Sequence, residues 1–273
     1  MQKLDVKLIA LDLDDTLLDN NRAISDANVK ALQECAKRGI YIVLCSGRAE
    51  NAILPFVRRL EIAGMEQGRY LIAINGCSIF DMHKRNQIFC SKVDSSLLLR
   101  VNQIAEEYGL KSEVYTPDTI YYNKCTEWTK LDVDLCGLKG QEVEDYENLL
   151  RQGFTKMLVP GDPELLQTLQ KQLKEELGSK AVIFTSKPYF LEILPPGCGK
   201  GEAVSYLAKH IGIPVEKTMG FGDSMNDESM FKLCGYGIAM QNALPYIKSI
   251  ASYVTRLDNN NSGIADFLRE YVL

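Results

Sequence analysis

Two aspartates near the start of the chain have a spacing that suits metal or phosphate chemistry. The stretch from Leu8 to Leu18 reads LIALDLDDTLL, so an apolar run leads directly into Asp12, Asp14 and Asp15. Such a run is typical of a strand in a parallel sheet covered on both faces, and ligands of these sheets bind at the carboxyl ends of the strands. In extended backbone the side chains of Asp12 and Asp14 would project to the same side and reach one cation and one phosphate. If the pair stood alone, an acidic turn after a strand would be the better explanation.

Two further predicted strands end in small polar residues. The strand over 40–45 stops at Ser46-Gly47, ahead of a helix over 50–60, and a hydroxyl with free N–H groups at such a place can bind an anion. The strand over 70–74 ends in Asn75-Gly76, a pair that usually forms a tight turn, with 78–81 as the second arm of a hairpin. The strand–helix–strand order predicts an α/β fold with a parallel sheet.

A lysine and a second acidic stretch follow in the last third of the chain. Lys200 lies in PPGCGKGEAV at the head of a predicted helix over 202–211, where the helix dipole stabilises anions. A P-loop is excluded because Gly201 stands where Ser or Thr is required. The stretch MGFGDSMNDESM over 219–230 predicts a short strand followed by a helix start, at which each acidic residue alone would be explained as a helix cap.

Together, these stretches resemble the four motifs of the haloacid dehalogenase superfamily of phosphohydrolases, in the same order. DLDDTLL matches Asp-x-Asp-x-Thr, Ser46 matches the hydroxyl of the second motif, and Lys200 matches the lysine of the third. GDSMND matches the fourth motif in the Gly-Asp-x-x-Asn-Asp form typical of the Cof-type branch. The resemblance covers nearly the whole chain and implies a Rossmann-like parallel-sheet core with an inserted α/β cap domain.

The resemblance also implies a role for each matched residue. Asp12 would be the nucleophile and Asp14 the general acid and base. A hard cation is required because two carboxylates and a phosphate dianion repel one another, and Mg²⁺ fits. Its ligands would be the Asp12 carboxylate, the Asp14 backbone carbonyl and the Asp223 carboxylate. The other matched groups would bind phosphate oxygens (Lys200, Ser46, the Gly47 and Leu13 N–H groups, Asn226) or support the site (Thr16, Asp227).

The middle of the chain changes in character from about Lys84. Predicted strands alternate there with predicted helices, the strands at 88–93, 112–116, 119–123, 156–159 and 181–186 and the helices at 95–108, 143–150 and 164–177. We predict a separate α/β domain over 84–188 and a catalytic core formed by 1–83 and 189–273. In Cof-type proteins such an insert forms a mobile cap that selects the substrate. Trp128 is either a core residue of the insert or a platform for substrate, and Lys139-Gly140 is predicted as a loop.

The composition limits the partners. A net charge of −5 over 273 residues argues against nucleic acid or an anionic membrane as the main partner. No apolar run approaches the roughly 18 residues of a membrane span, and the charged N-terminal segment does not match a signal peptide. Eight cysteines without a C-x-x-C pair fit reduced thiols in a cytoplasmic protein.

We therefore predict a Mg²⁺-dependent phosphatase that hydrolyses small phosphate monoesters, such as sugar phosphates or cofactor-like phosphates, through an aspartyl phosphate. A phosphomutase or phosphotransferase on the same scaffold is one alternative. A receiver-like signalling module phosphorylated on aspartate is another, although receivers are much shorter and have no inserted cap. The sequence indicates neither the physiological substrate nor the oligomeric state.

Overall fold

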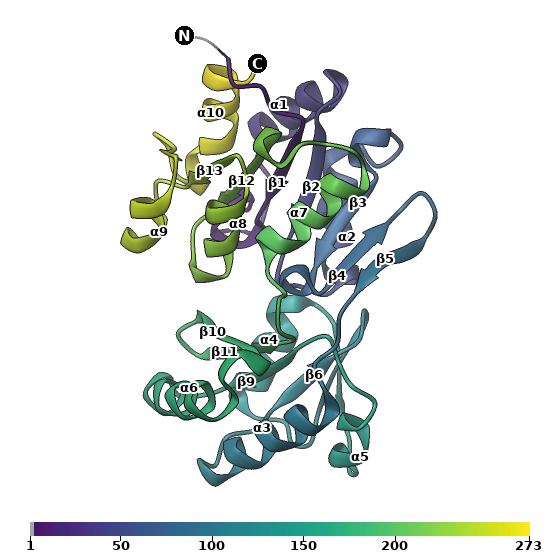
Figure 1. Ribbon diagram of the computed structural model, residues 1–273, viewed down its shortest axis with the longest axis vertical. Helices are drawn as coiled ribbons and strands as arrows, with labels where there is room; N and C mark the ends of the chain where they lie inside the picture. Colours follow the sequence, from purple (N-terminus) through teal and green to yellow (C-terminus); the bar gives the residue numbers. More distant parts are fainter. Residues whose placement is uncertain (1–2) are drawn as a thin grey trace. The chain divides into compact units, whose positions relative to one another are not determined.

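The computed structural model describes residues 3–273, and the chain divides into two compact units (Figure 1). Unit 1 contains the chain up to Gly47, Ile53–Phe89 and Gly199–Leu273, and unit 2 contains Arg48–Ala52 and Cys90–Cys198. The long segment of the second unit, Cys90–Cys198, thus begins and ends later than the predicted 84–188 insert. The later end follows from strand pairing, because the strand Phe190–Leu194 joins the sheet of unit 2 instead of returning to the core.

Unit 1 is built on one eight-stranded sheet with the order β14-β13-β12-β1-β2-β3-β4-β5. Six of its strands pair in parallel, with β1 between β12 and β2, and β4 runs antiparallel to β3. The predicted α/β class with a Rossmann-like parallel sheet is confirmed, and so is the hairpin arm over 78–81. The strands are β1 (Leu8–Leu11), β2 (Tyr41–Cys45), β3 (Tyr70–Ala73), β4 (Ser78–Asp81), β5 (Asn86–Cys90), β12 (Thr218–Gly222), β13 (Tyr236–Ala239) and β14 (Tyr253–Val254).

Local sequence signals explain where some helices of unit 1 begin. Ser25, for example, caps the first helix by accepting a hydrogen bond from the N–H of Asn28 at 3.2 Å. The helices are α1 (Asp26–Lys37), α2 (Glu50–Leu60, whose first residues belong to unit 2), α7 (Lys200–His210), α8 (Glu228–Leu233), α9 (Pro245–Ile250) and α10 (Gly263–Tyr271).

The central strand β1 is completely buried, which explains its uniformly apolar sequence. Leu8, Ile9, Ala10 and Leu11 each have no exposed surface. Leu8 and Ala10 belong to the same apolar cluster as residues of α7. Burying one Leu or Ile side chain stabilises a fold by roughly 1.5–3 kcal/mol, so this strand is firmly held and its carboxyl end is a rigid place for a reactive side chain.

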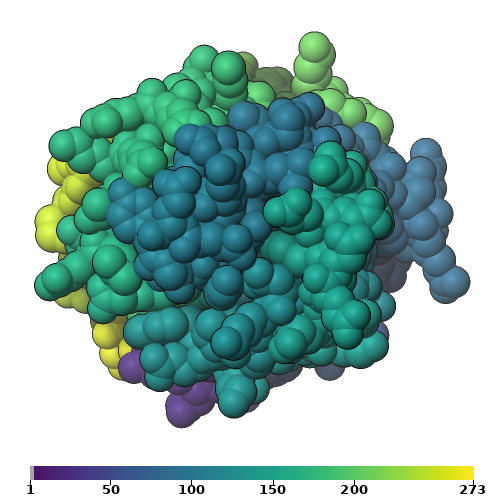
Figure 2. All heavy atoms as spheres, turned by 90° about the horizontal axis from the view of Figure 1, so that it is seen from below, coloured from purple at the N-terminus to yellow at the C-terminus, as the bar shows by residue number. Residues whose placement is uncertain are grey.

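Unit 2 has a six-stranded sheet in the order β10-β11-β9-β6-β7-β8, antiparallel except for the β7–β8 pair. Its apolar core lies between one face of this sheet and the helices α3 and α6, which pack against each other on the surface in Figure 2. The strands are β6 (Glu113–Tyr115), β7 (Thr119–Tyr122), β8 (Lys139–Glu142), β9 (Met157–Pro160), β10 (Val182–Lys187) and β11 (Phe190–Leu194), and the helices are α3 (Ser95–Glu107), α4 (Glu127–Cys136), α5 (Tyr146–Leu150) and α6 (Pro163–Leu177).

Several parts of the predicted insert differ from the sequence-based expectation. The strand predicted at 88–93 is β5, which belongs to the sheet of unit 1, and the helix α4 was not predicted. The predicted loop at Lys139-Gly140 is wrong, because these residues form β8, which pairs in parallel with β7 at the edge of the sheet. Its sequence KGQE shows no alternation of apolar residues, so only the pairing reveals it. Trp128 lies in the first turn of α4, half-buried, and stacks on Tyr189 with ring centroids 5.8 Å apart; it is not part of the apolar core of unit 2.

Two expectations from composition can be compared with the structure. Within residues 3–273, no helix has both the length and the apolar character needed to cross a membrane. All eight cysteines lie in this part of the chain, and all are free thiols. Five of them are buried, where cysteine packs as a small apolar side chain.

A buried ion pair fastens the β3–β4 hairpin of unit 1. The guanidinium of Arg69 donates from Nε and Nη2 to the two carboxylate oxygens of Asp81, at 2.9 and 2.7 Å. The Asp81 carboxylate is only 1% exposed and also accepts the N–H groups of His83 and Lys84. These bonds, that of Arg69 above all, lower the pKa of Asp81 to about 2.

We predict that Asp81→Asn lowers the free energy of unfolding by about 2 kcal/mol at neutral pH, because a depressed carboxyl pKa is a stabilising contribution. This contribution is complete above the unfolded-state pKa of about 4 and disappears as the pH falls toward about 2, so wild type and variant should converge in that window. Urea unfolding as a function of pH measures this. Glu34→Gln, which removes an exposed pair with Arg38, is the control and should change stability by no more than a few tenths of a kcal/mol.

Candidate active site

The first acidic motif leaves the sheet directly after β1. The N–H of Asp12 still donates to the carbonyl of Phe221 at 3.1 Å, and Leu13–Leu17 form a turn in which the N–H of Leu18 donates to the carbonyl of Leu13 at 2.9 Å. Asp15 has a φ of 61°. Asp12 and Asp14 themselves have the extended dihedral angles that the sequence predicts, with ψ values of 158° and 128°. The chain turns at Asp15.

Side chains from the last third of the chain hold this turn in place. Thr16 Oγ1 donates to Asp223 Oδ1 at 2.8 Å, the amide of Asn242 donates to the carbonyl of Asp15 at 2.7 Å, and the amide of Asn259 donates to the carbonyl of Leu18 at 2.9 Å. Asn242 and Asn259 were not predicted as supporting residues, because an asparagine in a polar loop carries no distinct sequence signal. The motif turn is thus fixed by partners more than 200 residues away.

Lys200 lies at the centre of the site with no exposed surface. Its Nζ is 2.5 Å from Asp12 Oδ1 and 2.6 Å from Asp227 Oδ1. It is the first residue of α7, as predicted from its place at a helix start. Gly201 lets this helix approach α8, since a Cβ there would lie 2.2 Å from the carbonyl oxygen of Ser229. The close helix contact therefore determines where Lys200 enters the site.

Asp227 is fully engaged by the protein. Its Oδ1 accepts from Lys200, and its Oδ2 accepts the N–H groups of Asp223 and Ser224 at 2.9 and 3.1 Å. Gly222 makes this possible, because a Cβ at that position would lie 2.4 Å from the Asp227 carboxyl carbon. Asp227 therefore orients Lys200 and the backbone around Asp223.

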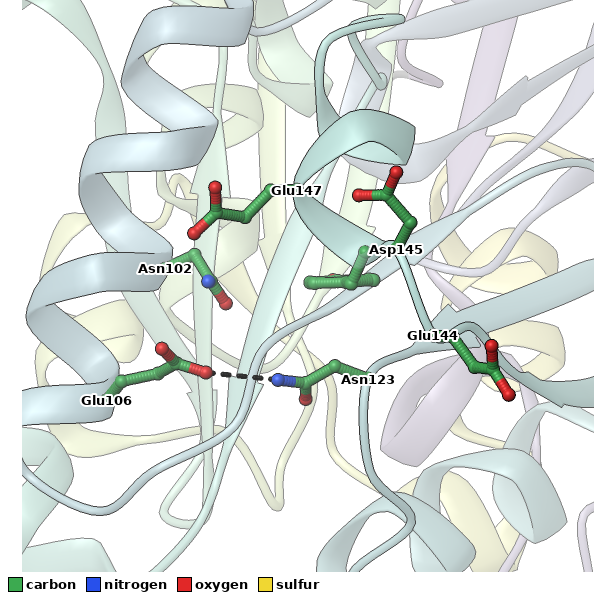
Figure 3. A pocket seen from close by; sticks show the side chains of 7 residues that line it. Asn102, Glu106, Asn123, Glu144, Asp145 and Glu147 are labelled. Atoms are coloured by element: carbon green, nitrogen blue, oxygen red, sulfur yellow. Dashed lines mark hydrogen bonds between the residues drawn. The ribbon is translucent and has the colours of Figure 1, made fainter.

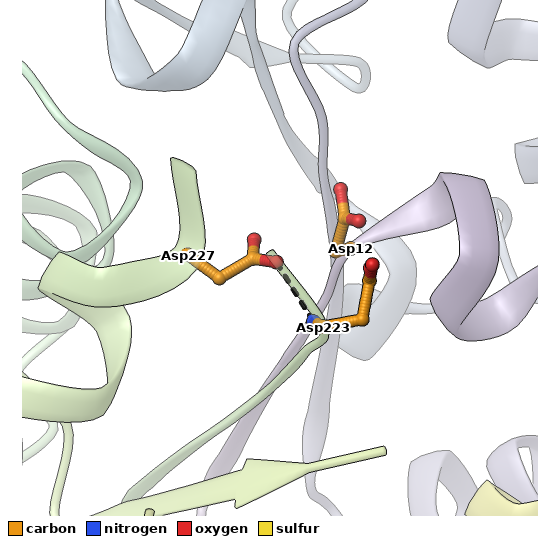
Figure 4. Close-up of side chains that lie close together, drawn as sticks. All are labelled: Asp12, Asp223 and Asp227. Carbon is orange, nitrogen blue, oxygen red and sulfur yellow. Dashed lines mark hydrogen bonds between the residues drawn. The ribbon is translucent and has the colours of Figure 1, made fainter. Parts of the chain in front are cut away.

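The carboxylates of Asp12, Asp223 and Asp227 gather in one small buried space (Figure 4). Each offers an oxygen within 4.8 Å of the others. Burial and the nearby Asp227 raise the pKa of Asp12 to about 7, although Lys200 opposes the shift. Burial, with Asp227 and Asp12, raises the pKa of Asp223 well above its usual value. Burial lowers the pKa of Lys200, but the two carboxylates more than compensate, so Lys200 stays protonated.

The charge balance of this group fits a bound metal ion. Three carboxylates face a single lysine, so one further divalent cation would balance the excess negative charge. The donors are all carboxylate oxygens, which suit a hard cation. Because both oxygens of Asp227 are engaged, Asp12 and Asp223 are the side chains best able to bind it. The carboxylate of Asp14, which is half-buried, is not part of the group.

The remaining predicted residues surround the same end of the sheet. Ser46 and Gly47 follow β2, and Ser46 is 1% exposed. Asn226 is half-buried and donates from Nδ2 to Asn75 Oδ1 at 3.2 Å. Asn75 was not among the predicted site residues, although the Asn-Gly pair at the end of a third strand was a signal that could have identified it.

Unit 2 contains an acidic hollow that does not suit phosphate. A cavity of about 310 Å³ is surrounded by side chains that Figure 3 shows, including the carboxylates of Glu106, Glu144, Asp145 and Glu147. Four carboxylates repel a phosphate dianion. The lysine, the N–H groups and the amides that could bind phosphate are in unit 1 instead.

Comparison with known proteins agrees with this geometry. Residues 9–268 match the family described as haloacid dehalogenase-like hydrolase. The chain belongs to this family. A solved haloacid dehalogenase-like hydrolase from Bacteroides thetaiotaomicron is 30% identical, with a TM-score of 0.87 over 97% of this chain and 99% of that one. The predicted membership in the superfamily is confirmed.

Relatives of this chain are named as phosphatases. A 5-amino-6-(5-phospho-D-ribitylamino)uracil phosphatase of Bacillus subtilis is 30% identical, covering 96% of this chain and 97% of its own. An HMP-PP phosphatase of Serratia proteamaculans is 26% identical, covering 97% and 95%. The present hydrolase is accordingly a phosphatase, and its buried aspartate cluster can bind a divalent metal.

We predict that Gly222→Ala damages this site more than Gly220→Ala on the same strand. The methyl group at 222 would lie 2.4–2.6 Å from atoms of the Asp227 side chain and force it away from Lys200. Overpacking of this kind costs about 1–3 kcal/mol in stability, and turnover of an aryl phosphate should fall more than tenfold. At 220 the nearest atom is Met230 Cβ at 3.1 Å, so a shift of a few tenths of an ångström would relieve the contact. Equal losses in both variants would contradict this account of Gly222.

Proposed function

We propose that the protein is a Mg²⁺-dependent phosphatase of small phosphate monoesters that transfers the phosphoryl group first to Asp12 and then to water. The observation that carries this proposal is the direct contact of the buried Asp12 carboxylate with Lys200, 2.5 Å apart, at the carboxyl end of the central strand. A nucleophile on a rigid strand, next to a fixed positive charge, is what in-line phosphoryl transfer needs.

Mg²⁺ would be held by the carboxylates of Asp12 and Asp223 and by the backbone carbonyl of Asp14. When bound, it would supply positive charge that offsets the repulsion between these carboxylates and the phosphate. Thr16, which donates to Asp223 Oδ1, would keep that carboxylate turned toward Asp12. Asp227 would keep Lys200 in place through the bond between their side chains.

The phosphate oxygens would be bound by groups that donate hydrogen bonds to them. Lys200, the Ser46 hydroxyl, the N–H groups of Leu13 and Gly47, and the amide of Asn226 fill this role in the proposal. Donors fixed in position before the reaction stabilise the charge of the transition state without reorganisation. Asp14 would protonate the leaving alcohol and then remove a proton from the attacking water, which is typically worth ~10²–10⁴-fold in rate.

The substrate class is a sugar phosphate or a cofactor-like phosphate. Two relatives of similar sequence identity are named for different substrates, a ribitylaminouracil phosphate and HMP-PP. This supports a catalytic site that the family shares and a separate part of the protein that selects the substrate and differs between relatives. We propose that unit 2 is this selecting part and serves as a cap, because it is inserted between the second and third motifs. A panel of phosphate esters compared by kcat/KM would identify the preferred leaving group.

We predict that metal removal abolishes turnover. Protein treated with EDTA should lose hydrolysis of an aryl phosphate, and added Mg²⁺ should restore it, because the carboxylates and the phosphate otherwise repel one another.

Two variants test the metal site. Asp223→Asn removes a proposed metal ligand, and the control Asp266→Asn removes a surface carboxylate that pairs with Arg256. Asp223→Asn should raise the Mg²⁺ concentration needed for half-maximal activity by about tenfold or more, since it removes a charged ligand. Asp266→Asn should leave that concentration unchanged. Full activity in the presence of EDTA would refute the metal assignment.

We predict that Asp14→Asn separates two classes of substrate. An alkyl ester needs a protonated leaving group, whereas an aryl ester with an acidic phenol leaves largely unaided. The variant should therefore lose alkyl phosphate hydrolysis most severely, by ~10²–10⁴-fold. With an aryl phosphate it should release one equivalent of phenol rapidly and then turn over slowly.

Stopped-flow measurement of phenol release shows this burst. Asp12→Asn is the comparison, and it should release neither phenol from the aryl ester nor alcohol from the alkyl ester, because the nucleophile is absent. Equal losses on both ester types, with no burst, would remove Asp14 from the acid and base role.

A further inference from the structure

The turn Ile74–Gly76 at the end of β3 has an unusual backbone. Three consecutive residues have positive φ values, Ile74 at 51°, Asn75 at 50° and Gly76 at 94°. A positive φ is a genuine outlier for a β-branched residue such as isoleucine and costs of order 1–3 kcal/mol. Such strain persists only where the surroundings enforce it, and it is concentrated at functional sites.

This turn contacts the segments that carry three of the four motifs. The N–H of Asn75 donates to the carbonyl of Ser46 at 2.9 Å, and the Asn75 amide lies 3.0 Å from the place where a Cβ on Gly47 would be. A Cβ on Gly76 would lie 2.2 Å from the carbonyl oxygen of Gly199, which caps the helix that begins at Lys200. The Asn75 side chain also accepts from Asn226.

The contact with Asn226 determines which way its amide is turned. Asn226 Oδ1 accepts the hydroxyl of Ser224 at 2.7 Å, and one N–H of its Nδ2 donates to Asn75 Oδ1 at 3.2 Å. With the oxygen and one hydrogen engaged, the amide cannot rotate by half a turn without losing both bonds. Its second N–H is left for another acceptor.

We propose that Asn75 is a positioning residue of the phosphate site, which fixes the amide of Asn226 and the turn at Ser46-Gly47 so that both present N–H groups to the same phosphate oxygens. This inference rests on the proposed phosphatase function. Asn75 itself is 1% exposed and acts through its two neighbours. Asparagine suits the place because it tolerates a positive φ and carries an amide acceptor.

The test measures binding of inorganic phosphate, in the presence of Mg²⁺, by isothermal titration calorimetry, with turnover of an aryl phosphate beside it. Asn75→Gly removes the amide and keeps a residue that adopts positive φ freely. We expect its Kd for phosphate and its KM to rise by about tenfold or more, because a charge-assisted hydrogen bond is misdirected. Asn28→Ala, at another asparagine of unit 1 with 1% exposure, whose side chain accepts from the N–H of Ala265, is the control and should keep wild-type phosphate affinity.

A double-mutant cycle with Asn226→Ala distinguishes positioning from general support of the fold. If Asn75 acts through Asn226, adding Asn75→Gly to Asn226→Ala should weaken phosphate binding less than it does in the wild type. Asn75→Asp keeps the size of the side chain and its hydrogen-bond acceptor, so it can be measured if the Asn75→Gly variant fails to fold. Its added negative charge should also weaken phosphate binding by about tenfold or more.

Several results would overturn the inference. One is wild-type phosphate affinity in a folded Asn75→Gly or Asn75→Asp variant. Another is full additivity of the two substitutions in the double-mutant cycle. A third is an Asn75 variant that is less stable than the wild type but binds phosphate as tightly. If the wild type neither turns over an aryl phosphate nor binds inorganic phosphate, the proposed function fails and the inference fails with it. An active wild type whose Asn75 variants bind phosphate normally refutes the role of Asn75 alone.

Discussion

Mutual repulsion among Asp12, Asp223 and Asp227 is the constraint on which the rest of the site depends. Three buried carboxylates lie within 4.8 Å of one another, and Lys200 neutralises only one of their charges. Removing such groups from water costs several kcal/mol for each ion unless partners compensate. Every neighbouring feature supplies part of that compensation, from the N–H groups that bind Asp227 to the hydroxyl that binds Asp223. A divalent cation completes this balance of charge in the proposed reaction.

The sheet makes this concentration of charge tolerable. The central strand is wholly buried and carries Asp12 at its end, while β12 alongside it carries Asp223. Glycines then allow approaches that side chains would prevent, at Gly222 against Asp227 and at Gly201 against α8. Strained and repulsive sites are commonly maintained in this way, by a surrounding fold that is stable enough to enforce them. The same reasoning explains the strained turn at Ile74 and Asn75.

How much the sequence predicts depends on whether the signal is local. The burial of β1 and the helix start at Lys200 follow from short patterns, and motif order was enough to indicate that Asp12, Lys200 and Asp223 meet. The turn of the chain after Asp14 could not be predicted, because Asn242 and Asn259 from the far end of the chain hold it. The strand β8 was missed because only pairing with β7 creates it. Asn75 was not included among the site residues because an Asn-Gly pair usually forms an ordinary turn, although its place at the end of a third strand pointed to the site.

The central claim is that Asp12 forms a covalent bond to phosphorus, and chemical trapping measures it most directly. Protein mixed with an aryl phosphate and Mg²⁺, quenched during turnover and reduced with borohydride, should contain homoserine at position 12, because borohydride reduces an acyl phosphate to an alcohol. Mass spectrometry of the peptide that contains Leu8–Leu18 identifies the modified residue. The account predicts modification at Asp12 alone, absent when the phosphate ester is omitted. Modification at Asp14 or Asp223 instead, or none in protein that is turning over substrate, would contradict it.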